Sequence, residues 1–163
     1  MSADQTSAPA VPAPAAPAPV ITHAGMTPRT PHKLFVNIPV ADVQRSIVFF
    51  EALGFAFNPQ FTDATGTCML VGSDAYFMLL ERSRFEGFSG RPVGDPQQQT
   101  AAMFALSVDS RTEVDAMIGK AVAAGGTDAK KPQDHGFMYG QAFYDVDGHH
   151  WEVFWMDPAT VNG

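Results

Sequence analysis

The stretch LFVNIPVADVQRSIVFFEALG, residues 34–54, decides how this chain folds. Every second residue from Val36 to Val40 is β-branched, which is typical of the face of a strand that packs on a core. Asp42 suits a helix N-cap, and Gly54 suits the position at which a helix ends. Between them, apolar residues recur at helical spacing. The stretch therefore predicts a strand that leads directly into a helix, with both elements turning apolar sides toward one core.

The order of strand, helix and further strands occurs twice along the chain. In the first occurrence we expect strands at 34–40, 55–57, 67–71 and 76–81. In the second, Ser110 and Glu113 form a capping box at the start of a helix that Gly125 closes. Strands are expected there at 103–108, 128–130, 139–145 and 149–156. The repeated order predicts a duplicated unit.

The two predicted units span residues 33–81 and 101–157. The connection between them, residues 82–100, is rich in Gly, Pro and Gln, and a connection this long in a compact domain is a lid or a linker. The predicted fold class is α+β, with two βαβββ units forming a cupped mixed sheet and a helix on the outer face of each. We expect a single domain over residues 33–163, with a small-molecule cavity on its inner side.

Residues 1–32 differ in composition from the rest of the chain. They are mostly Ala, Pro, Ser and Thr. Proline at this density blocks both helical and ladder hydrogen bonds, so we expect an extended, solvated tail. The segment lacks the basic start and continuous apolar run of a secretory signal. We expect it to have no catalytic role.

Charge and composition narrow the class of partner. The 163 residues carry a formal net charge of −7, which argues against binding to nucleic acid or to an anionic membrane surface, because both require clustered Lys and Arg. The single cysteine, Cys68, excludes an internal disulfide and fits a reducing compartment. No stretch has the apolar length that spans a bilayer. We expect a cytoplasmic protein whose partner is a small organic ligand.

Four segments carry a resemblance to a known family. They are NIPVAD at 37–42, FFEALGF at 49–55, ALSVD at 105–109 and DVDGHHWEV at 145–153. The chain resembles the vicinal-oxygen-chelate superfamily, which contains glyoxalase I, extradiol dioxygenases, and bleomycin- and fosfomycin-resistance proteins. The resemblance covers the body of the chain and not the tail. It implies the glyoxalase/bleomycin resistance/dihydroxybiphenyl dioxygenase fold and a homodimer, but no single activity, because the family includes lyases, dioxygenases and binding proteins.

The resemblance also implies four inward-facing positions that hold a divalent metal in enzymes of the family. They fall at Phe35, Met78, Met103 and Glu152. Phenylalanine has no donor atom, and the methionine thioether is a poor ligand for zinc, nickel, manganese or iron(II). One carboxylate does not hold such an ion firmly. We therefore expect no cofactor at these positions.

Glu152 is the candidate catalytic residue. Strand alternation places it toward the cavity, in apolar surroundings that suit a general base or a hydrogen-bond anchor for a ligand. The alternative is a carboxylate that only bonds neighbouring polar groups. The candidate ligand-binding residues share an expected position on an inner strand face. They are Phe35, Asn37, Met78, Met103, Tyr139, Gln141, Phe143 and Phe154.

A displaced metal site is the alternative for cofactor chemistry. His135, His150 and Glu152 are in principle a two-histidine, one-carboxylate set. The first hypothesis for function is a small-molecule-binding protein without the usual metal site, of the binding or resistance type or a metal-free enzyme using Glu152. The second is a metal-dependent glyoxalase-like lyase or extradiol-type dioxygenase with rearranged ligands. A third is a fold used only for protein interaction.

Overall fold

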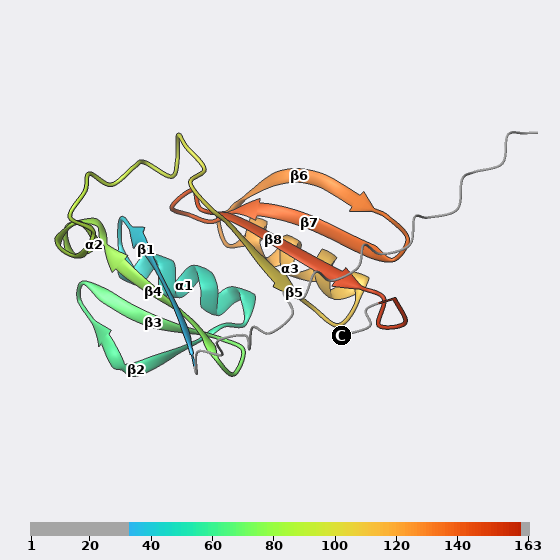
Figure 1. The fold of residues 1–163 in the computed structure, drawn as a ribbon, viewed down its shortest axis with the longest axis horizontal. Coiled ribbons are helices and arrows are strands. Elements are labelled where there is room, and N and C mark those ends of the chain that lie inside the picture. The colour runs from blue at the N-terminus through green and yellow to red at the C-terminus, as the bar shows by residue number, and fades with distance from the viewer. Residues whose placement is uncertain (1–32, 161–163) are drawn as a thin grey trace, which may run out of the picture. The chain divides into compact units, whose positions relative to one another are not determined.

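The computed structural model describes residues 33–160, and all of these belong to one compact unit. They form two four-stranded mixed sheets and three helices, the predicted α+β class (Figure 1). The predicted tail, residues 1–32, lies outside the described residues. None of the helices described over 33–160 has the length and apolar character needed to cross a membrane.

The first βαβββ unit follows the predicted order. Its elements are β1 (Leu34–Val40), α1 (Val43–Leu53), β2 (Ala56–Asp63), β3 (Gly66–Val71) and β4 (Ala75–Glu81). The sheet has the strand order β1-β4-β3-β2, with β1 parallel to β4 and the other pairs antiparallel. In β1, Val36, Ile38 and Val40 pack against the core, and Phe35 and Asn37 alternate with them on the exposed side.

The second unit repeats this topology. Its elements are β5 (Met103–Ser107), α3 (Arg111–Ala123), β6 (Thr127–Asp134), β7 (Met138–Tyr144) and β8 (His150–Met156). The strand order is β5-β8-β7-β6, with β5 parallel to β8. The duplication predicted from the order of elements is therefore confirmed at the level of strand pairing.

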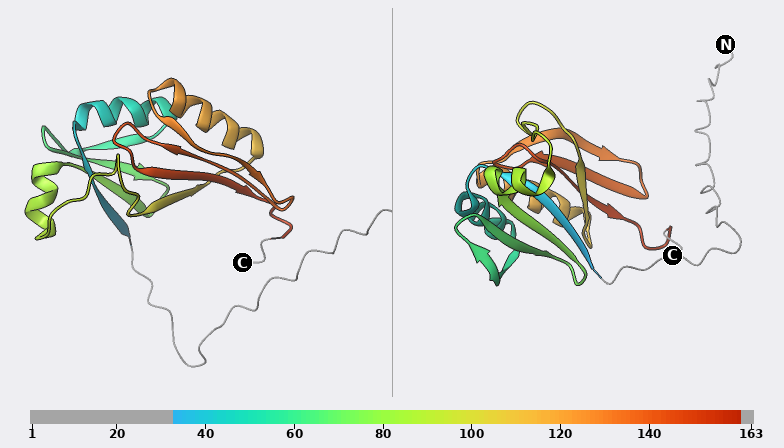
Figure 2. Two further views of the ribbon diagram at one scale, coloured as in Figure 1. Left: turned by 90° about the horizontal axis from the view of Figure 1, so that it is seen from above. Right: turned by 60° about the vertical axis from the view of Figure 1, so that its left-hand side comes forward.

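One hydrophobic core serves both units. Helices α1 and α3 pack against each other on the same side of the strands (Figure 2). The indole of Trp151 lies 5.2 Å from the ring of Phe50 and 4.8 Å from that of Phe77, between ring centroids. Because Trp151 belongs to the second unit and both phenylalanines to the first, burial of these rings holds the two units together.

Capping residues set the ends of both long helices as the sequence predicts. The Asp42 side chain accepts a hydrogen bond from the Arg45 backbone N–H at 2.8 Å. Gly54 ends α1 with φ 104°, a left-handed conformation that favours glycine. In α3 the Ser110 hydroxyl accepts from the Glu113 N–H at 3.1 Å. Each side chain satisfies a backbone donor that the first helical turn leaves free.

The connection between the units differs from the prediction. Its first part forms helix α2 (Arg82–Ser89), where we expected no regular structure. The helix has no side-chain N-cap and no buried residue, so neither of the usual sequence signals marks it. Strands β2 and β6 are also longer than predicted. The sequence did not indicate the added residues, because most of them are exposed and show no apolar alternation.

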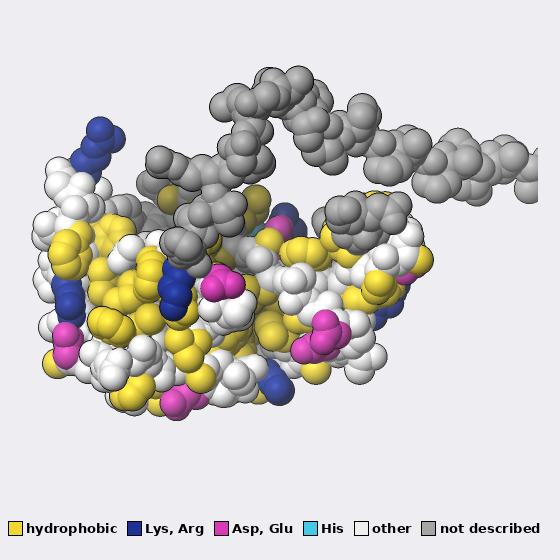
Figure 3. Space-filling model, turned by 60° about the horizontal axis from the view of Figure 1, so that its bottom comes forward, with side chains coloured by type: hydrophobic (Ala, Val, Ile, Leu, Met, Phe, Trp, Pro, Cys, Tyr) yellow, Lys and Arg dark blue, Asp and Glu magenta, His cyan; other side chains and the backbone are white. Residues whose placement is uncertain are grey.

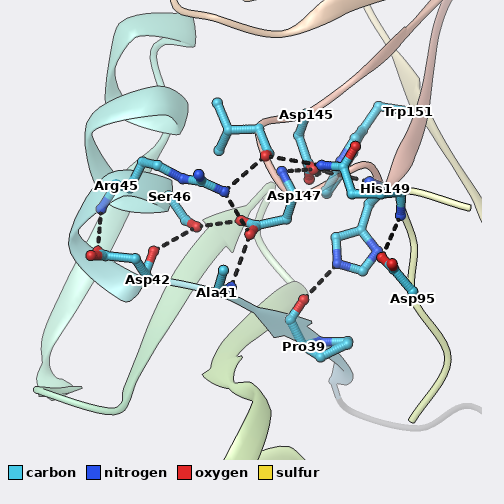
Figure 4. A network of polar contacts seen from close by, with 12 residues as sticks. Pro39, Ala41, Asp42, Arg45, Ser46, Asp95, Asp145, Asp147, His149 and Trp151 are labelled. Atoms are coloured by element: carbon cyan, nitrogen blue, oxygen red, sulfur yellow. Dashed lines mark hydrogen bonds and ion pairs between the residues drawn. The ribbon is translucent and has the colours of Figure 1, made fainter.

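The turn between β7 and β8 fastens the second unit to the start of α1 (Figure 4). Asp147 is buried, and its carboxylate accepts hydrogen bonds from the Ala41 N–H at 2.9 Å and from the Ser46 hydroxyl at 2.8 Å. The Arg45 guanidinium forms an ion pair with it at 2.9 Å. His149 Nε2 is bonded to the Pro39 carbonyl oxygen at 2.7 Å. These contacts fix the relative position of β1 and the β7–β8 turn.

Candidate functional site

The face of each sheet opposite α1 and α3, which we call the open face, carries several of the residues predicted to line a cavity, among them Phe35, Met103 and Glu152. The space-filling view shows hydrophobic side chains gathered over broad areas, interrupted by single charged groups (Figure 3). On this face Phe35 is 53 % exposed and Met103 57 % exposed. Phe35 stacks on Tyr76 with 4.8 Å between ring centroids. The open face is therefore partly apolar and accessible.

A cavity of about 430 Å³ lies between the two units, and we call it the seam cavity. Its walls come from residues 36–39 of β1, the connection between Phe85 and Ala102, Phe104, and residues 148–150. The apolar lining includes Ile38, Phe85 and Phe104, and the polar lining residues are Asn37, Ser89, Arg91, Gln99, Thr100, His149 and His150. Ligand cavities in proteins have volumes of roughly 300–1,000 Å³. The seam cavity therefore has the size and character of a site for a small organic molecule.

Hydrogen bonds and close packing hold the connection in place as a wall of this cavity. The Arg82 guanidinium donates to the carbonyl oxygens of Val93 and Gly94. Gly148 has φ 93°, and a Cβ there would lie 2.8 Å from the Gln97 backbone nitrogen, so the connection packs directly on the β7–β8 turn. The connection thus both links the two units and encloses the cavity.

His150 is the unusual polar group in this region. The residue is 5 % exposed, and it lines the seam cavity from the start of β8. Its Nε2 is buried without a hydrogen-bond partner among the described residues. The Glu152 Oε1 atom lies 4.0 Å away. Buried polar atoms are almost always paired in folded proteins, so an unpaired one marks a candidate binding group.

A second cavity, about 310 Å³, lies on the open face of the second sheet, and we call it the sheet groove. Its lining includes the predicted residues Gln141, Glu152 and Phe154. Glu152 is one-third exposed, and its Oε1 lies 3.6 Å from the Lys130 ammonium. Glu152 and Phe154 lie on the same side of β8. The expectation of purely apolar surroundings is wrong, because Lys130 reaches the carboxylate from β6.

The predicted ligand-binding residues do not form one site. Asn37 lines the seam cavity, and Phe154 lines the sheet groove. Phe35, Met78 and Met103 line neither of these two cavities. Their separation follows from the sheets, because β1 and β4 belong to one sheet and β5 and β8 to the other.

Tyr139, Gln141 and Phe143 correct the prediction for β7. Phe143 is fully buried opposite Trp151 in the core. The Tyr139 hydroxyl donates to Asp115 Oδ1 of α3 at 2.8 Å, and the Gln141 amide also donates to that oxygen. Placing these three side chains on the inner face was wrong. In a strand, a shift of one residue exchanges the two faces. Tyr139 and Gln141 can face α3 because Asp115 accepts a hydrogen bond from each of them.

The residues at the family's metal positions do not fit a divalent metal. Phe35 has no donor atom, Met78 and Met103 offer only thioethers, and Glu152 supplies one carboxylate. The displaced set is also wrong. His135 lies in the turn between β6 and β7, whereas His150 pairs with Tyr144 at the other end of β7, about 20 Å along the strand. Within 33–160, no three His, Cys, Asp or Glu side chains are grouped to hold a metal.

Cys68 of β3 and Lys130 of β6 are two further residues with side chains capable of chemistry or charge pairing. Burial raises the pKa of the Cys68 thiol, which disfavours the reactive thiolate. Lys130 was not among the predicted site residues. It lies in the polar part of β6, which carries no apolar alternation, and only strand pairing brings it opposite Ala142 and hence near Glu152. No signal in the sequence identifies such a neighbour.

Comparison with solved structures shows many related folds. A hypothetical protein from S. aureus, SA1046, shares 27 % identity over 78 % of this chain and 95 % of its own, with a TM-score of 0.67. A glyoxalase-related enzyme from Fulvimarina pelagi shares 21 % identity over 75 % of this chain and 86 % of its own, with a TM-score of 0.65. The fosfomycin resistance protein FosX from Listeria monocytogenes shares 18 % identity over 83 % of this chain and 98 % of its own, with a TM-score of 0.57.

Comparison of the sequence with family models gives the same family as the fold does. A search of the curated proteins found no match. The family model for the Glyoxalase/Bleomycin resistance protein/Dioxygenase superfamily matches residues 32–153, which include both βαβββ units except the end of β8. With the repeated topology and the motif residues of β1, α1 and β8 in place, the chain belongs to the Glyoxalase/Bleomycin resistance protein/Dioxygenase superfamily.

Proposed function

We propose that this chain binds a small, largely apolar organic molecule in the seam cavity, without a metal at the family's four ligand positions. The observation that carries the proposal is an apolar cavity of about 430 Å³ beside a buried, unpaired His150 Nε2. Apolar walls supply affinity, and sparse polar groups supply orientation. Asn37, Arg91 and His150 are among the polar residues that line the cavity. The resemblance to FosX, a fosfomycin resistance protein, supports a binding or resistance role.

The first test is a thermal-shift screen of the full chain against antibiotics and metabolites. A ligand that binds the folded state raises the melting temperature by an amount that grows with its affinity and concentration. Metal analysis of the same preparation tests the second part of the proposal. A stoichiometric divalent ion, or turnover of catechols or of the methylglyoxal–glutathione adduct that depends on one, would instead favour a metal-dependent lyase or dioxygenase.

The second test locates the ligand. Phe85 of α2 lines the seam cavity, whereas Phe88 of the same helix is 75 % exposed and does not. We expect Phe85→Ala to weaken binding of a screening hit about tenfold, because an aromatic wall is lost, and Phe88→Ala to leave it unchanged. Calorimetric titration measures both. Equal affinities in the two variants would place the ligand elsewhere.

The predicted homodimer and cytoplasmic location belong to the same proposal. Phe35 and Met103, each more than half exposed on the open face, offer apolar surface that a second copy of the chain would cover. Light scattering coupled to size-exclusion chromatography tests this: a monomer at all concentrations would remove the dimer from the proposal. We propose no nucleic-acid or membrane partner.

A further inference from the structure

The sheet groove has an apolar floor and one charged end, and it is separate from the seam cavity. Phe154 and Met156 of β8 and Met138 of β7 lie on its floor. Lys130 and Lys131 of β6 line the charged end together with Glu152. The residues that line the groove include two lysines and one glutamate, which is a formal charge of +1, and the Lys130 ammonium lies 3.6 Å from Glu152 Oε1. In a chain of net charge −7, a local positive excess beside apolar side chains is distinctive.

Strand pairing explains how Lys130 reaches Glu152. Lys130 pairs with Ala142 of β7, and Ala142 pairs with Glu152 of β8, so the three side chains share one face. Strands lie about 4.8 Å apart, and a lysine is long enough to cross one intervening strand when the residue between is as small as alanine. At 3.6 Å and with 48 % of the Lys130 side chain exposed, the ion pair is open to a competing anion.

A second partner for Glu152 lies on its other side. The unpaired Nε2 of His150 is 4.0 Å from Oε1, the same oxygen that lies 3.6 Å from Lys130. A small movement of the carboxylate toward His150 would bring it within hydrogen-bond distance of Nε2 and lengthen the Lys130 contact. The Glu152 carboxylate therefore lies between Lys130 and His150, and it is paired only with Lys130, the more exposed of the two.

Going beyond the proposed function, we propose that the sheet groove is a second site, which binds organic anions that have an apolar body and a carboxylate head. Lys130 and Lys131 hold the head, and the floor side chains cover the body. When the ligand carboxylate takes Lys130, Glu152 turns to His150 and accepts a hydrogen bond from its Nε2–H. The exchange gives the buried His150 Nε2–H an acceptor. It also moves the Glu152 carboxylate away from the ligand carboxylate, and both effects favour binding.

The test uses octanoate as the probe and octan-1-ol as its uncharged counterpart. Calorimetric titration of the full chain is expected to show binding of octanoate, with octan-1-ol at least about tenfold weaker because it cannot form charge-assisted hydrogen bonds. Added salt should weaken the octanoate interaction, since exposed charges are screened. Equal affinity for the two probes would overturn the proposal.

Lysine variants identify the groups that hold the head. Lys130→Met and Lys131→Met keep most of the apolar stem and remove the charge. Each is expected to weaken octanoate binding about tenfold, whereas Lys120→Met on α3 is the matched control and should bind normally. Lys120 is exposed and does not line the groove. Unchanged affinity in both groove variants would overturn the proposal.

Glu152→Gln separates this proposal from a direct role of Glu152 in holding the ligand. If Glu152 only competes for Lys130, its neutral replacement should bind octanoate several-fold more tightly. Weaker binding would mean that the carboxylate itself anchors the ligand, and would contradict the exchange. In the original chain, the His150 imidazole nitrogen resonances should shift on addition of octanoate, and this shift should be much smaller in the Glu152→Gln variant.

The two proposed sites share His150, but variants of other residues distinguish them. Phe85→Ala alters the seam cavity and should leave octanoate binding unchanged, because Phe85 does not line the sheet groove. If Phe85→Ala weakens octanoate binding and Lys130→Met does not, the anion occupies the seam cavity and the inference about the sheet groove is wrong. The proposed function would then stand, with an anion as its ligand.

Discussion

At the scale of single residues, the exposed ion pairs of Asp63 on β2 and Asp134 on β6 stabilise the fold less as the pH falls. Asp134, beside the Arg111 guanidinium and the Gly136 N–H, has its pKa lowered to about 2, and Asp63, which accepts hydrogen bonds from Thr65 and Arg84, has a pKa also lowered to about 2. A carboxyl group whose pKa falls on folding stabilises the folded state above its unfolded pKa. That contribution is lost as the pH falls toward 2.

We expect Arg111→Met to reduce the acid dependence of stability. Removing the guanidinium takes away the main cause of the low Asp134 pKa, so the folded and unfolded values approach each other. The difference in melting temperature between the original chain and the variant should then be largest above pH 4 and should shrink between about pH 4 and pH 2. Melting curves at closely spaced pH values measure this. A difference that grows toward pH 2 would contradict the assignment.

At the scale of elements, side-chain caps and apolar stripes define α1 and α3, and their absence explains why α2 was not predicted. In α3, the Ser110 hydroxyl accepts from the Glu113 N–H, while the Glu113 carboxylate accepts from the Asp109 N–H at 3.0 Å. Val114 and Ile118 are buried on the same helix, but Val122, counted in the predicted stripe, is 45 % exposed. The cap was therefore a more reliable guide than the far end of the stripe.

Ser110→Ala should destabilise the chain by about 1 kcal/mol, because the Glu113 N–H loses its partner at the N-terminus of α3. Thr112→Ala in the same turn is the control, since Thr112 is exposed and is expected to change stability by less than about 0.5 kcal/mol. Urea unfolding measures both. Equal effects would mean that helix propensity, and not the cap, controls this terminus.

At the scale of the whole molecule, buried polar contacts join the two units in addition to the aromatic core. Asp145 and Asp147 lie in one turn, and both are buried. Burial raises the pKa of Asp145, although hydrogen bonds from the Trp151 indole and the His149 N–H favour its charged form. Asp147 faces the N-terminus of α1, where free backbone N–H groups favour an anion. This turn sets the position of β1 against β8, and with it the shape of the seam cavity.

Replacing Asp147 tests the coupling between the units. In Asp147→Ala the Ala41 N–H, Ser46 hydroxyl and Arg45 guanidinium lose their acceptor. We expect a loss of about 1–3 kcal/mol in the free energy of unfolding. Asp128→Ala, an exposed position on β6, serves as the control and should lie within about 0.5 kcal/mol of the original chain. Urea unfolding followed by tryptophan fluorescence distinguishes the two.

The amino-acid sequence by itself determined the two βαβββ units, their long helices and the side of β1 that faces the core, because alternation, caps and glycine ends are local signals. It also determined that Phe35, Met78 and Met103 cannot serve as strong ligands for the divalent metals of this family, since that conclusion needs only side-chain chemistry. The tertiary structure decided which side chains meet. Strand pairing brings Lys130 to Glu152, places Tyr139, Gln141 and Phe143 on the helix side, and sets His135 far from His150. Such neighbours depend on register between distant segments, and one residue of register exchanges the faces of a strand.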